Sequence, residues 1–367
     1  MSGFMLSQKR MRMVVMKNKN THEAMKILVT GASGFIGSFI IEEGIKRGHQ
    51  MFAGMRKSSS KAYLDNPQIK FIELDFSRPE ILRAQLSAAQ KDFGGWDVVV
   101  HAAGATKCVR REDFFKTNTD GTRHFVEALK DLGMIPQRFI FLSSLSVYGA
   151  IREEATSSSG NTWIYSPIKE DDIPQPNTAY GESKLKAEQF IKSVKDFPFV
   201  ILRPTGVYGP REKDYFMMAQ SIKQHIDFCV GYKPQEITFV YVKDLVNAVF
   251  LAMQQDVVGR EFFISDGGIY HSTEFSDLIR KELGNPFMLR IKAPIWFLRI
   301  VCSISGYISS LRGKTTTLNR DKFHILCQRN WQCDIEPACK ELGYTPEYSL
   351  ERGVKETIAW YKKEGWL

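Results

Sequence analysis

The chain has 367 residues, 43% of them hydrophobic, which is enough to form the large core of an ordinary globular protein. Its formal net charge is +9, but six lysines and arginines and a single acid fall within the first 26 residues. The remainder is too weakly basic for nucleic-acid binding, which requires a basic stripe on the folded domain, so we expect no nucleic-acid partner.

The first segment, residues 1–24, is a basic and methionine-rich leader. Its longest apolar run, MVVM, is too short for the core of a signal peptide, and no small-residue cleavage site follows it. We therefore expect a disordered leader on a cytoplasmic protein, with an arm that touches nucleic acid or a membrane as the alternative.

From Lys26 onward, short β-rich runs alternate with helical patterns. The runs are KILVTG, QMFAGM, IKFIEL, DVVVHAA and RFIFLSS, and helical patterns continue to Ile45 and recur near 81–89 and 118–132. Such alternation is typical of a doubly wound parallel sheet with helices on both faces. We predict an α/β fold with a Rossmann domain in residues 25–203 and 237–258.

The regular alternation stops in two places. Residues 151–178 are rich in serine and proline and are predicted to be a long loop. After FVILRP the pattern becomes irregular, and we predict a smaller C-terminal mixed α/β substrate domain built from residues 204–236 and 259–367.

The stretch KILVTGASGFIG places three glycines between the first strand and the first helix. Gly31 permits the tight turn, Gly34 lets the backbone approach a pyrophosphate, and Gly37 lets helix and strand pack closely. The helix N-terminus then offers N–H groups and a positive dipole end to the phosphates. This spacing predicts a dinucleotide site; a glycine-rich turn without a ligand is the alternative.

The second strand ends in FAGMRKSSS. Where NAD-binding proteins carry an acid for the ribose 2′-hydroxyl, this chain has Met55, followed by Arg56 and Lys57. Arg56 can form a forked pair with a 2′-phosphate, so we predict NADP(H) in preference to NAD(H). If Arg56 and Lys57 are merely solvated, the preference stays open.

Two tyrosine–lysine pairs have helical spacing, Tyr165 with Lys169 and Tyr180 with Lys184. Pro167 lies inside the first pair and prevents the helical turn that would bring its side chains together. Tyr180 instead follows the turn-forming PQPNTA and begins a helix. We therefore select Tyr180 and Lys184, with a solvated surface pair as the alternative.

Hydroxyl groups provide the third component of this candidate site. Ser143, Ser144 and Ser146 follow the strand RFIFL, at the sheet edge where open α/β sheets bind ligands. Serine binds a substrate oxygen, and we expect the nearby ammonium of Lys184, together with a cationic nicotinamide, to favour the phenolate of Tyr180. Tyr180 can then exchange a proton with an alcohol or ketone as hydride moves between substrate and nicotinamide.

The six cysteines contain no CxxC pair, so we expect reduced thiols. The spacing of His324, Cys327, Cys333 and Cys339 matches no common zinc site, and we expect no metal.

Together, TGASGFIG, HAAG, NTDGT, LSSLSVYG, YGESK, RPTGVYGP and FVYVKDL resemble the extended branch of the short-chain dehydrogenase/reductase superfamily, the NAD-dependent epimerase/dehydratase family. The resemblance covers residues 25 to about 270. It implies Ser144, Tyr180 and Lys184 as catalytic residues supported by Asn118. It also implies a homodimer formed through the helices that start near Asn118 and Tyr180.

The resemblance assigns further residues to ligands. The cofactor contacts would be Gly31, Ser33, Gly34, Phe35, Ile36, Gly37, Arg56, Asp75, Phe76, Ala102, Ala103, Gly104, Ser143, Tyr180, Lys184, Pro204, Thr205, Gly206 and Val207. The substrate contacts would be Lys107, Ser146, Tyr148 and Arg211.

The motif RPTGVYGP bears on the reaction. Family members that act on sugar nucleotides usually have Asn where this chain has Gly206, which makes this chain more similar to the 3β-hydroxysteroid dehydrogenase and dihydroflavonol reductase groups. We expect hydride transfer between NADP(H) and a secondary alcohol or ketone of a largely apolar small molecule, such as a steroid-like compound. The alternatives are a nucleotide-sugar epimerase or dehydratase with tightly bound NAD, in which Arg211 would bind a diphosphate, and a non-catalytic dinucleotide sensor.

Residues 293–311, APIWFLRIVCSISGYISSL, have helical apolar spacing but are too short and too polar to span a membrane. Three interpretations stay open for this helix. It is a core helix, a lid over an apolar pocket, or a helix that lies on a membrane surface.

Overall fold

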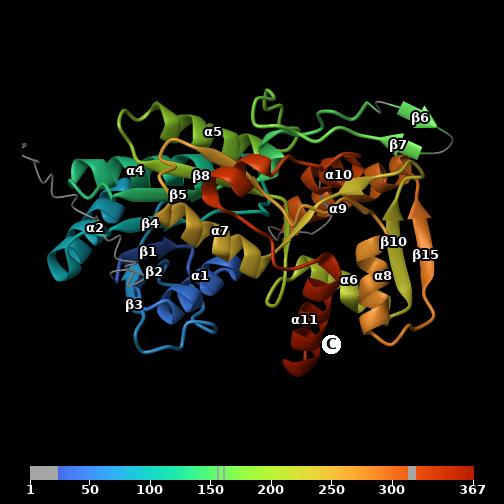
Figure 1. Cartoon of the computed structure of the whole chain (residues 1–367), viewed down its shortest axis with the longest axis horizontal. Coiled ribbons are helices and arrows are strands. Elements are labelled where there is room, and N and C mark those ends of the chain that lie inside the picture. Colours follow the sequence, from blue (N-terminus) through green and yellow to red (C-terminus); the bar gives the residue numbers. More distant parts are fainter. Residues whose placement is uncertain (1–23, 155–156, 160–161, 313–319) are drawn as a thin grey trace, which may run out of the picture.

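The computed structural model describes residues 24–154, 157–159, 162–312 and 320–367. The predicted leader, residues 1–24, lies outside them except for its last residue. One half of the molecule is a sheet covered by helices on both faces, and the other half carries most of the C-terminal elements (Figure 1).

A seven-stranded parallel sheet confirms the predicted doubly wound fold. Its order is β13-β8-β5-β4-β1-β2-β3. The strands are β1 (Lys26–Thr30), β2 (Gln50–Met55), β3 (Lys70–Glu73), β4 (Val98–His101), β5 (Arg138–Leu142), β8 (Phe199–Pro204) and β13 (Glu261–Ile264). The strand order reverses between β1 and β4, and in open α/β sheets a ligand binds at such a switch point.

Helices cover both faces because successive strand residues point to opposite sides. Ile27 and Val29 of β1 pack into one core, while Leu28 between them packs into the other. The first core is covered by α1 (Phe35–Lys46) and α7 (Val242–Gln254). The second is covered by α2 (Pro79–Phe93), α4 (Gly121–Asp131) and α5 (Ala179–Ser193). The short α3 (Arg111–Phe114) and the π-helix η1 (Phe115–Asp120) precede α4, and the 3₁₀ turn η2 (Leu145–Val147) follows β5.

The C-terminal half has a separate aromatic core that includes Tyr208, Phe239, Phe275 and Tyr361. Its helices are α6 (Asp214–Lys223), α8 (Glu274–Glu282), α9 (Ile295–Arg312), α10 (Arg320–Cys327) and α11 (Leu350–Lys363). Its strands form the pairs β9 (Gly206–Tyr208) with β12 (Phe239–Tyr241), β10 (Ile226–Val230) with β15 (Leu289–Ala293), and β11 (Glu236–Ile237) with β14 (Tyr270–His271).

The division between the halves differs from the predicted boundaries in two places. β13, which falls in the predicted substrate segment 259–367, is the edge strand of the main sheet. The π-helix η3 (Ala338–Leu342) returns to the same sheet, where Ala338 and Leu342 are buried in its core. Sequence pattern could not locate this return because contacts between distant segments determine it.

Two further segments that the sequence analysis singled out have defined structure. Within the predicted loop 151–178, β6 (Ser157–Ser159) and β7 (Thr162–Ile164) form an antiparallel hairpin. The helical pattern at 293–311 corresponds to α9, but large apolar residues on one side of α9 are exposed, so the interpretation as a core helix is wrong for that side. Among the described helices none has the length and apolarity needed to cross a bilayer.

A buried ion pair attaches α5 to the sheet. Arg203 of β8 donates to Glu188 of α5 at 2.7 and 3.1 Å, and both side chains are almost completely buried. Arg203 also pairs with Glu261 of β13 and donates to the hydroxyl of Tyr148 at 3.1 Å. Burial opposes the Arg203 charge, but the two carboxylates outweigh it and raise the pKa of the guanidinium.

We predict that Arg203→Met destabilises the protein by about 3–5 kcal/mol, because it leaves the buried Glu188 carboxylate without its partner. The measurement is the free energy of unfolding from urea titration. Lys192→Met is the matched control, since Lys192 pairs with Glu261 from a half-exposed position and should contribute less than about 1 kcal/mol. Equal losses in the two variants would show that the buried pair does not hold α5 in place.

Candidate active site

The predicted glycine turn lies at the switch point of the sheet. Gly31 has a φ of +68°, and a Cβ there would come within 2.8 Å of the Ala102 carbonyl oxygen and the Ala103 nitrogen. A Cβ on Gly37 would lie 2.3 Å from the Gly31 carbonyl oxygen. Both positions therefore require glycine, for the turn and for the close packing of β1 with α1.

The first turn of α1 suits a pyrophosphate. Gly34 is the N-cap residue, no side chain caps the helix, and its first turn contains no acid. The leading N–H groups of α1 are therefore left for an anion, which the helix dipole also favours. Phe35 and Ile36 begin the helix and pack partly against the core, while Ser33 is half-buried beside Gly34.

The side chains expected around the adenosine have mixed surroundings. Met55 ends β2 in the core, and the next residue, Arg56, is exposed. The carboxylate of Asp75 accepts from Ser77 and Arg78, and these hydrogen bonds, that of Ser77 first, lower the pKa of Asp75. Phe76 packs edge-on against His101, so its ring belongs to the core beneath the cofactor position.

The second predicted group is brought together at the end of β5. Tyr180 lies in the first turn of α5, and its phenol shares a hydrogen bond with the Ser144 side chain. Ser144 also donates to the Ser146 hydroxyl at 3.1 Å. Thr178 caps α5 by accepting from the Gly181 N–H at 3.0 Å, which confirms that the helix begins beside Tyr180.

The competing tyrosine–lysine pair is not helical. Tyr165 is buried, and its hydroxyl donates to the carbonyl of Pro234 at 3.4 Å. Lys169 lies beyond an isolated bridge at Ile168 and is exposed. As predicted, the segment around Pro167 does not form the helical turn that would bring Tyr165 and Lys169 together.

Lys184 is buried one helical turn after Tyr180. Burial lowers the pKa of the Lys184 ammonium to about 7, with Glu188 opposing the shift. The ammonium nitrogen lies 4.1 Å from the centre of the Phe141 ring and faces Gly104, where a Cβ would come within 3.8 Å of it. Lys184 therefore points toward the loop that follows β4.

The groups of the described chain do not lower the Tyr180 pKa by themselves. Burial raises the pKa of the Tyr180 phenol, and only its hydrogen bond with the Ser144 side chain opposes this effect. The reason is that loss of water disfavours the phenolate. In this state the Tyr180 hydroxyl is a proton donor.

Asn118 connects the parts of the candidate site. Its side chain accepts from the Ala105 N–H at 2.7 Å, donates to the Ala105 carbonyl at 3.0 Å and donates to the Ser183 hydroxyl at 2.9 Å. Ser183 in turn donates to the carbonyl oxygen of Tyr180 at 2.8 Å. Asn118 therefore joins the loop after β4 to the first turn of α5.

A buried histidine of the HAAG motif, for which the sequence predicts no role, lies beneath the site. His101 bonds to the hydroxyl of Thr30 at 2.8 Å through one ring nitrogen and to that of Thr122 at 3.0 Å through the other. Thr122 donates to the carbonyl of Asn118 at 2.6 Å. Burial, with help from the Lys184 charge, lowers the pKa of His101 to about 3, so the ring is neutral and links β1, β4 and η1.

A second residue that contacts the candidate site could not be predicted from the sequence. Asp321 of α10 accepts from the backbone N–H of Tyr180 at 3.2 Å, although the two residues are 141 positions apart. The carboxylate therefore lies at the N-terminus of α5, where the helix dipole favours an anion.

Three residues expected to touch the substrate have other partners. The Tyr148 hydroxyl accepts from Arg203 and donates to the Glu170 carbonyl within the core. Arg211 pairs with Glu42 at 2.5 Å and donates to the Ser38 hydroxyl at 2.9 Å. Lys107 pairs with Asp214. These partners come from distant segments, which is why the motif could not indicate them.

The remaining predicted cofactor residues lie at the carboxyl end of β8 and beside it. Pro204 ends β8, and Gly206 and Val207 begin β9. The side-chain hydroxyls of Ser143 and Thr205 are buried and bond to no group of the described chain. Because buried hydroxyls normally have partners, these two are available to a ligand.

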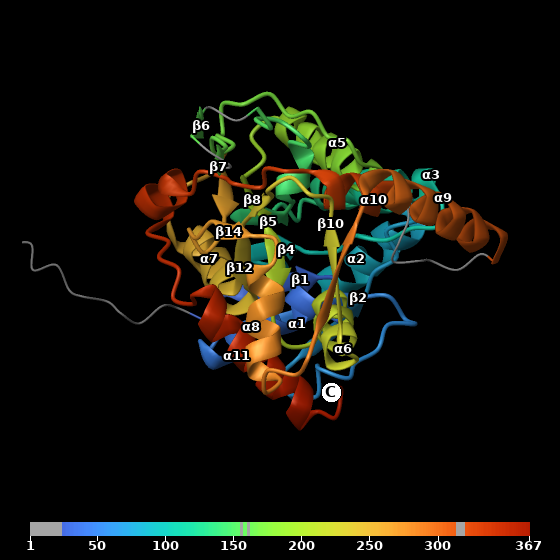
Figure 2. The ribbon, with the colours of Figure 1, turned by 90° about the vertical axis from the view of Figure 1, so that its right-hand side faces the viewer.

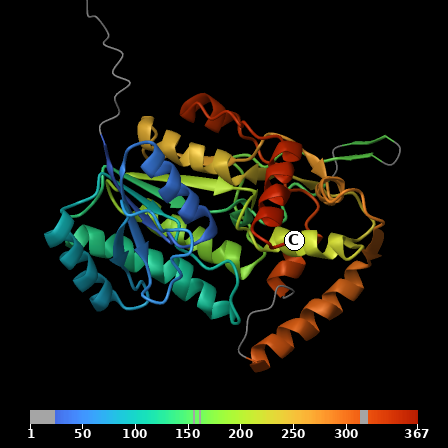
Figure 3. The ribbon, with the colours of Figure 1, turned by 90° about the horizontal axis from the view of Figure 1, so that it is seen from below.

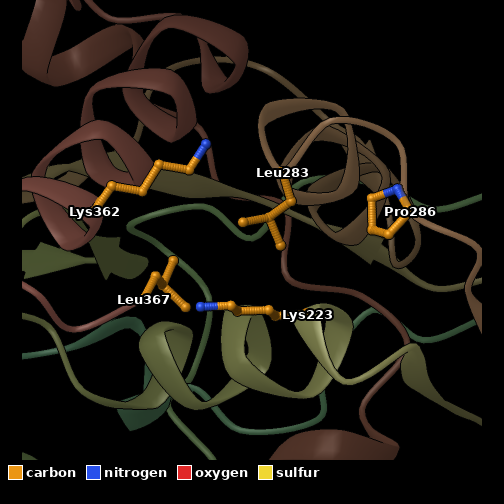
Figure 4. A pocket seen from close by; sticks show the side chains of 5 residues that line it. All are labelled: Lys223, Leu283, Pro286, Lys362 and Leu367. Atoms are coloured by element: carbon orange, nitrogen blue, oxygen red, sulfur yellow. The ribbon is translucent and has the colours of Figure 1, made fainter.

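Two cavities lie outside this constellation, and the larger, of about 600 Å³, has a lining that includes Glu42, Arg211, Lys243 and Trp360. A cavity of about 200 Å³ is lined by Lys223, Leu283, Pro286, Lys362 and Leu367, at the ends of α6, α8 and α11 (Figure 4). These five side chains include no acid, thiol or hydroxyl. The six cysteines form no disulfide bonds, and the described part of the chain contains no group of His, Cys, Asp and Glu that could hold a metal.

Comparison with known proteins identifies the family. The sequence profile named "NAD dependent epimerase/dehydratase family" matches residues 27–265. The chain belongs to this family.

The relatives of this family member span several reactions. It is 25% identical to sterol-4-α-carboxylate 3-dehydrogenase of Saccharomyces cerevisiae, over 91% of this chain and 97% of the relative. It is 26% identical to 2-alkyl-3-oxoalkanoate reductase of Stenotrophomonas maltophilia (91% and 99%) and 25% identical to UDP-glucose 4-epimerase of Vibrio cholerae (90% and 94%). Among solved structures, UDP-glucose 4-epimerase of Thermotoga maritima has a TM-score of 0.71 at 24% identity, covering 93% and 99%.

These relatives are dehydrogenases, reductases and epimerases. This epimerase/dehydratase family member is accordingly an enzyme of the extended short-chain dehydrogenase/reductase type, and an oxidoreductase. The glycine turn, the open N-terminus of α1 and the two orphan hydroxyls fit a dinucleotide.

We predict that the buried Lys184 makes the enzyme more stable at alkaline pH. Its pKa is about 7 in the folded chain and 10.5 as the reference value, so the unfolded chain binds more protons between these values and stability rises with pH. Urea titrations give the free energy of unfolding of wild type and of Lys184→Met at each pH. From about pH 7 to about pH 9, the difference between these free energies should change by on the order of 2 kcal/mol in favour of wild type.

Lys186→Met is the control for this measurement, because Lys186 is exposed on the same helix. Its stability difference from wild type should stay constant with pH. The same constancy in Lys184→Met would contradict the burial of a charged Lys184.

Proposed function

We propose that this enzyme transfers hydride between NADP(H) and a secondary alcohol or ketone of a largely apolar small molecule. The observation that carries the proposal is the constellation of Ser144, Tyr180 and Lys184, held by Asn118 at the sheet edge where the glycine turn would bind a dinucleotide. A sensor of dinucleotides would not need a positioned phenol.

The residues of the constellation have distinct roles in the proposal. A bound nicotinamide supplies or accepts the hydride. The Tyr180 hydroxyl gives its proton to the ketone oxygen, and Ser144 holds that oxygen by a hydrogen bond. Because the pKa of Lys184 is about 7, its amine can take up or release a proton near neutral pH and can support reprotonation of the phenol. Lys184 is buried and Tyr180 is partly buried one turn before it, which limits the access of water to this exchange.

The surroundings of Gly206 support an apolar substrate. A Cβ on Gly206 would lie 2.6 Å from the Tyr215 hydroxyl and 3.4 Å from the Phe239 ring, so aromatic side chains fill the space that an asparagine would need. Arg211 is also engaged by Glu42 and offers no unpaired cation to a diphosphate. The sterol dehydrogenase and oxoalkanoate reductase among the relatives fit a substrate of this kind.

A nucleotide-sugar epimerase with tightly held NAD is the second candidate. UDP-glucose 4-epimerase of Vibrio cholerae is as similar in sequence as the sterol dehydrogenase. The position of Arg56 argues for NADP(H), because a guanidinium stands where NAD-binding proteins carry an acid. The cytoplasmic location and the homodimer stay predictions.

We predict that Tyr180→Phe lowers kcat by about 10²–10⁴-fold and leaves NADPH affinity unchanged, since it removes the proton donor and keeps the ring. The measurement is NADPH oxidation with a panel of 3-oxosteroids and 3-oxoalkanoates, together with NADPH binding by fluorescence. Tyr165→Phe, in the other tyrosine–lysine pair, is the matched control and should keep wild-type kcat. Full activity in Tyr180→Phe would remove this phenol from the mechanism.

We predict that Arg56→Ala weakens binding of NADPH about tenfold or more and that of NADH much less, because only NADPH carries the 2′-phosphate. Binding constants for both cofactors test this difference. Lys91→Ala is the control and should change neither binding constant. Lys91 lies at the C-terminal end of α2, which is at the amino ends of the sheet strands, away from the cofactor position. Equal weakening of both cofactors by Arg56→Ala would refute the contact and favour the NAD-dependent candidate.

A further inference from the structure

Helix α9 has an exposed apolar face. Trp296 is 66% exposed, Ile304 is 55% exposed and Tyr307 is 66% exposed, and Phe297 and Ile300 between them are also exposed. At 100° per residue these five side chains fall within about one third of the helix circumference. Exposed apolar side chains gathered in this way indicate an interaction site.

The opposite side attaches α9 to the molecule. Leu298 and Cys302 are buried, and α9 packs against α10. In Figure 3, α9 extends outward from the rest of the chain. The helix is therefore anchored on one side only.

A second apolar face lies at the same end of the molecule. In the β10–β15 pair, Phe228, Leu289 and Ile291 are exposed on one side. Asp227 lies on the other side and pairs with Arg290 at 2.8 Å. Figure 2 looks onto the end of the molecule that carries β10, β15 and α9. Only Pro294 separates β15 from α9 in the chain, so the two elements follow each other directly at this end of the molecule.

The charge of this segment is uniformly positive. From Leu283 to Arg320 the sequence contains no acid and has the basic residues Arg290, Lys292, Arg299, Arg312, Lys314 and Arg320. Arg299 is exposed on α9 next to its apolar face, and Lys292 is exposed near the end of β15. A second copy of this face would be repelled by the like charges, whereas an anionic surface would be attracted.

We propose that α9 and the outer face of β10–β15 bind the surface of a membrane that contains anionic lipids. The apolar side chains enter the boundary between headgroups and acyl chains, and the lysine and arginine side chains reach the lipid phosphates. The helix lies in the plane of the interface and does not span the bilayer. α10, which packs against α9, also reaches the candidate active site, because Asp321 accepts from the backbone N–H of Tyr180.

Vesicle co-sedimentation of the full chain tests the proposal. Wild type should bind vesicles of phosphatidylcholine mixed with phosphatidylglycerol and bind pure phosphatidylcholine more weakly. The variant with Trp296→Gln, Ile300→Gln and Ile304→Gln should lose binding about tenfold or more. The variant with Lys292→Gln and Arg299→Gln should lose about fivefold per charge on the anionic vesicles.

A matched control keeps the result specific. The variant with Ile135→Gln, Ile173→Gln and Ile269→Gln also removes three exposed apolar side chains, but from other surfaces, and should bind like wild type. All variants retain the basic leader, so any leader contribution is constant. NADPH binding and thermal unfolding show that each variant is folded.

Three outcomes would overturn the proposal. The first is equal binding by the α9 variant and the isoleucine control. The second is equal binding of wild type to neutral and anionic vesicles. The third is that wild type binds no vesicles and that light scattering shows wild type to be a dimer and the α9 variant to be a monomer. This result would assign the face to a second copy of the chain.

Discussion

The buried ion pair between Arg203 and Glu188 is the constraint on which the candidate active site depends. A charged arginine in the sheet core requires a partner, and Glu188 provides it from α5. Glu188 lies one helical turn after Lys184 and two turns after Tyr180. Fixing Glu188 therefore fixes the depth and rotation at which the phenol and the amine reach the carboxyl edge of the sheet.

Hydrogen bonds between uncharged groups hold the other side of the candidate active site, next to β1 and β4. His101 stays uncharged because it is buried, and it links Thr30 at the end of β1 with Thr122, which bonds to the backbone of Asn118. Asn118 then holds the loop after β4 against α5. The glycine turn and the tyrosine helix are thus parts of one connected structure, so a ligand on α1 and a substrate near Tyr180 would be held in register.

The two halves of the molecule contribute different groups to the proposed function. The sheet half supplies the turn, the hydroxyls and the proton donor, all set by backbone geometry and buried polar contacts. The C-terminal half contributes the aromatic ring positions around Gly206 and the exposed face of α9. The carboxylate of Asp321 bridges the halves, because it reaches from α10 to the backbone of Tyr180.

The sequence by itself determined the parallel sheet, the glycine turn, and the choice of Tyr180 over Tyr165, because these follow from local period, turn chemistry and the single proline at 167. The tertiary structure alone decided that Tyr148 and Arg211 are used in packing, that Asp321 reaches Tyr180, and that β13 joins the main sheet. It also placed the Tyr180 phenol where burial raises its pKa, and it left one face of α9 exposed. The physical reason is that burial and long-range partners depend on which distant segments meet, and spacing along the chain does not encode that directly.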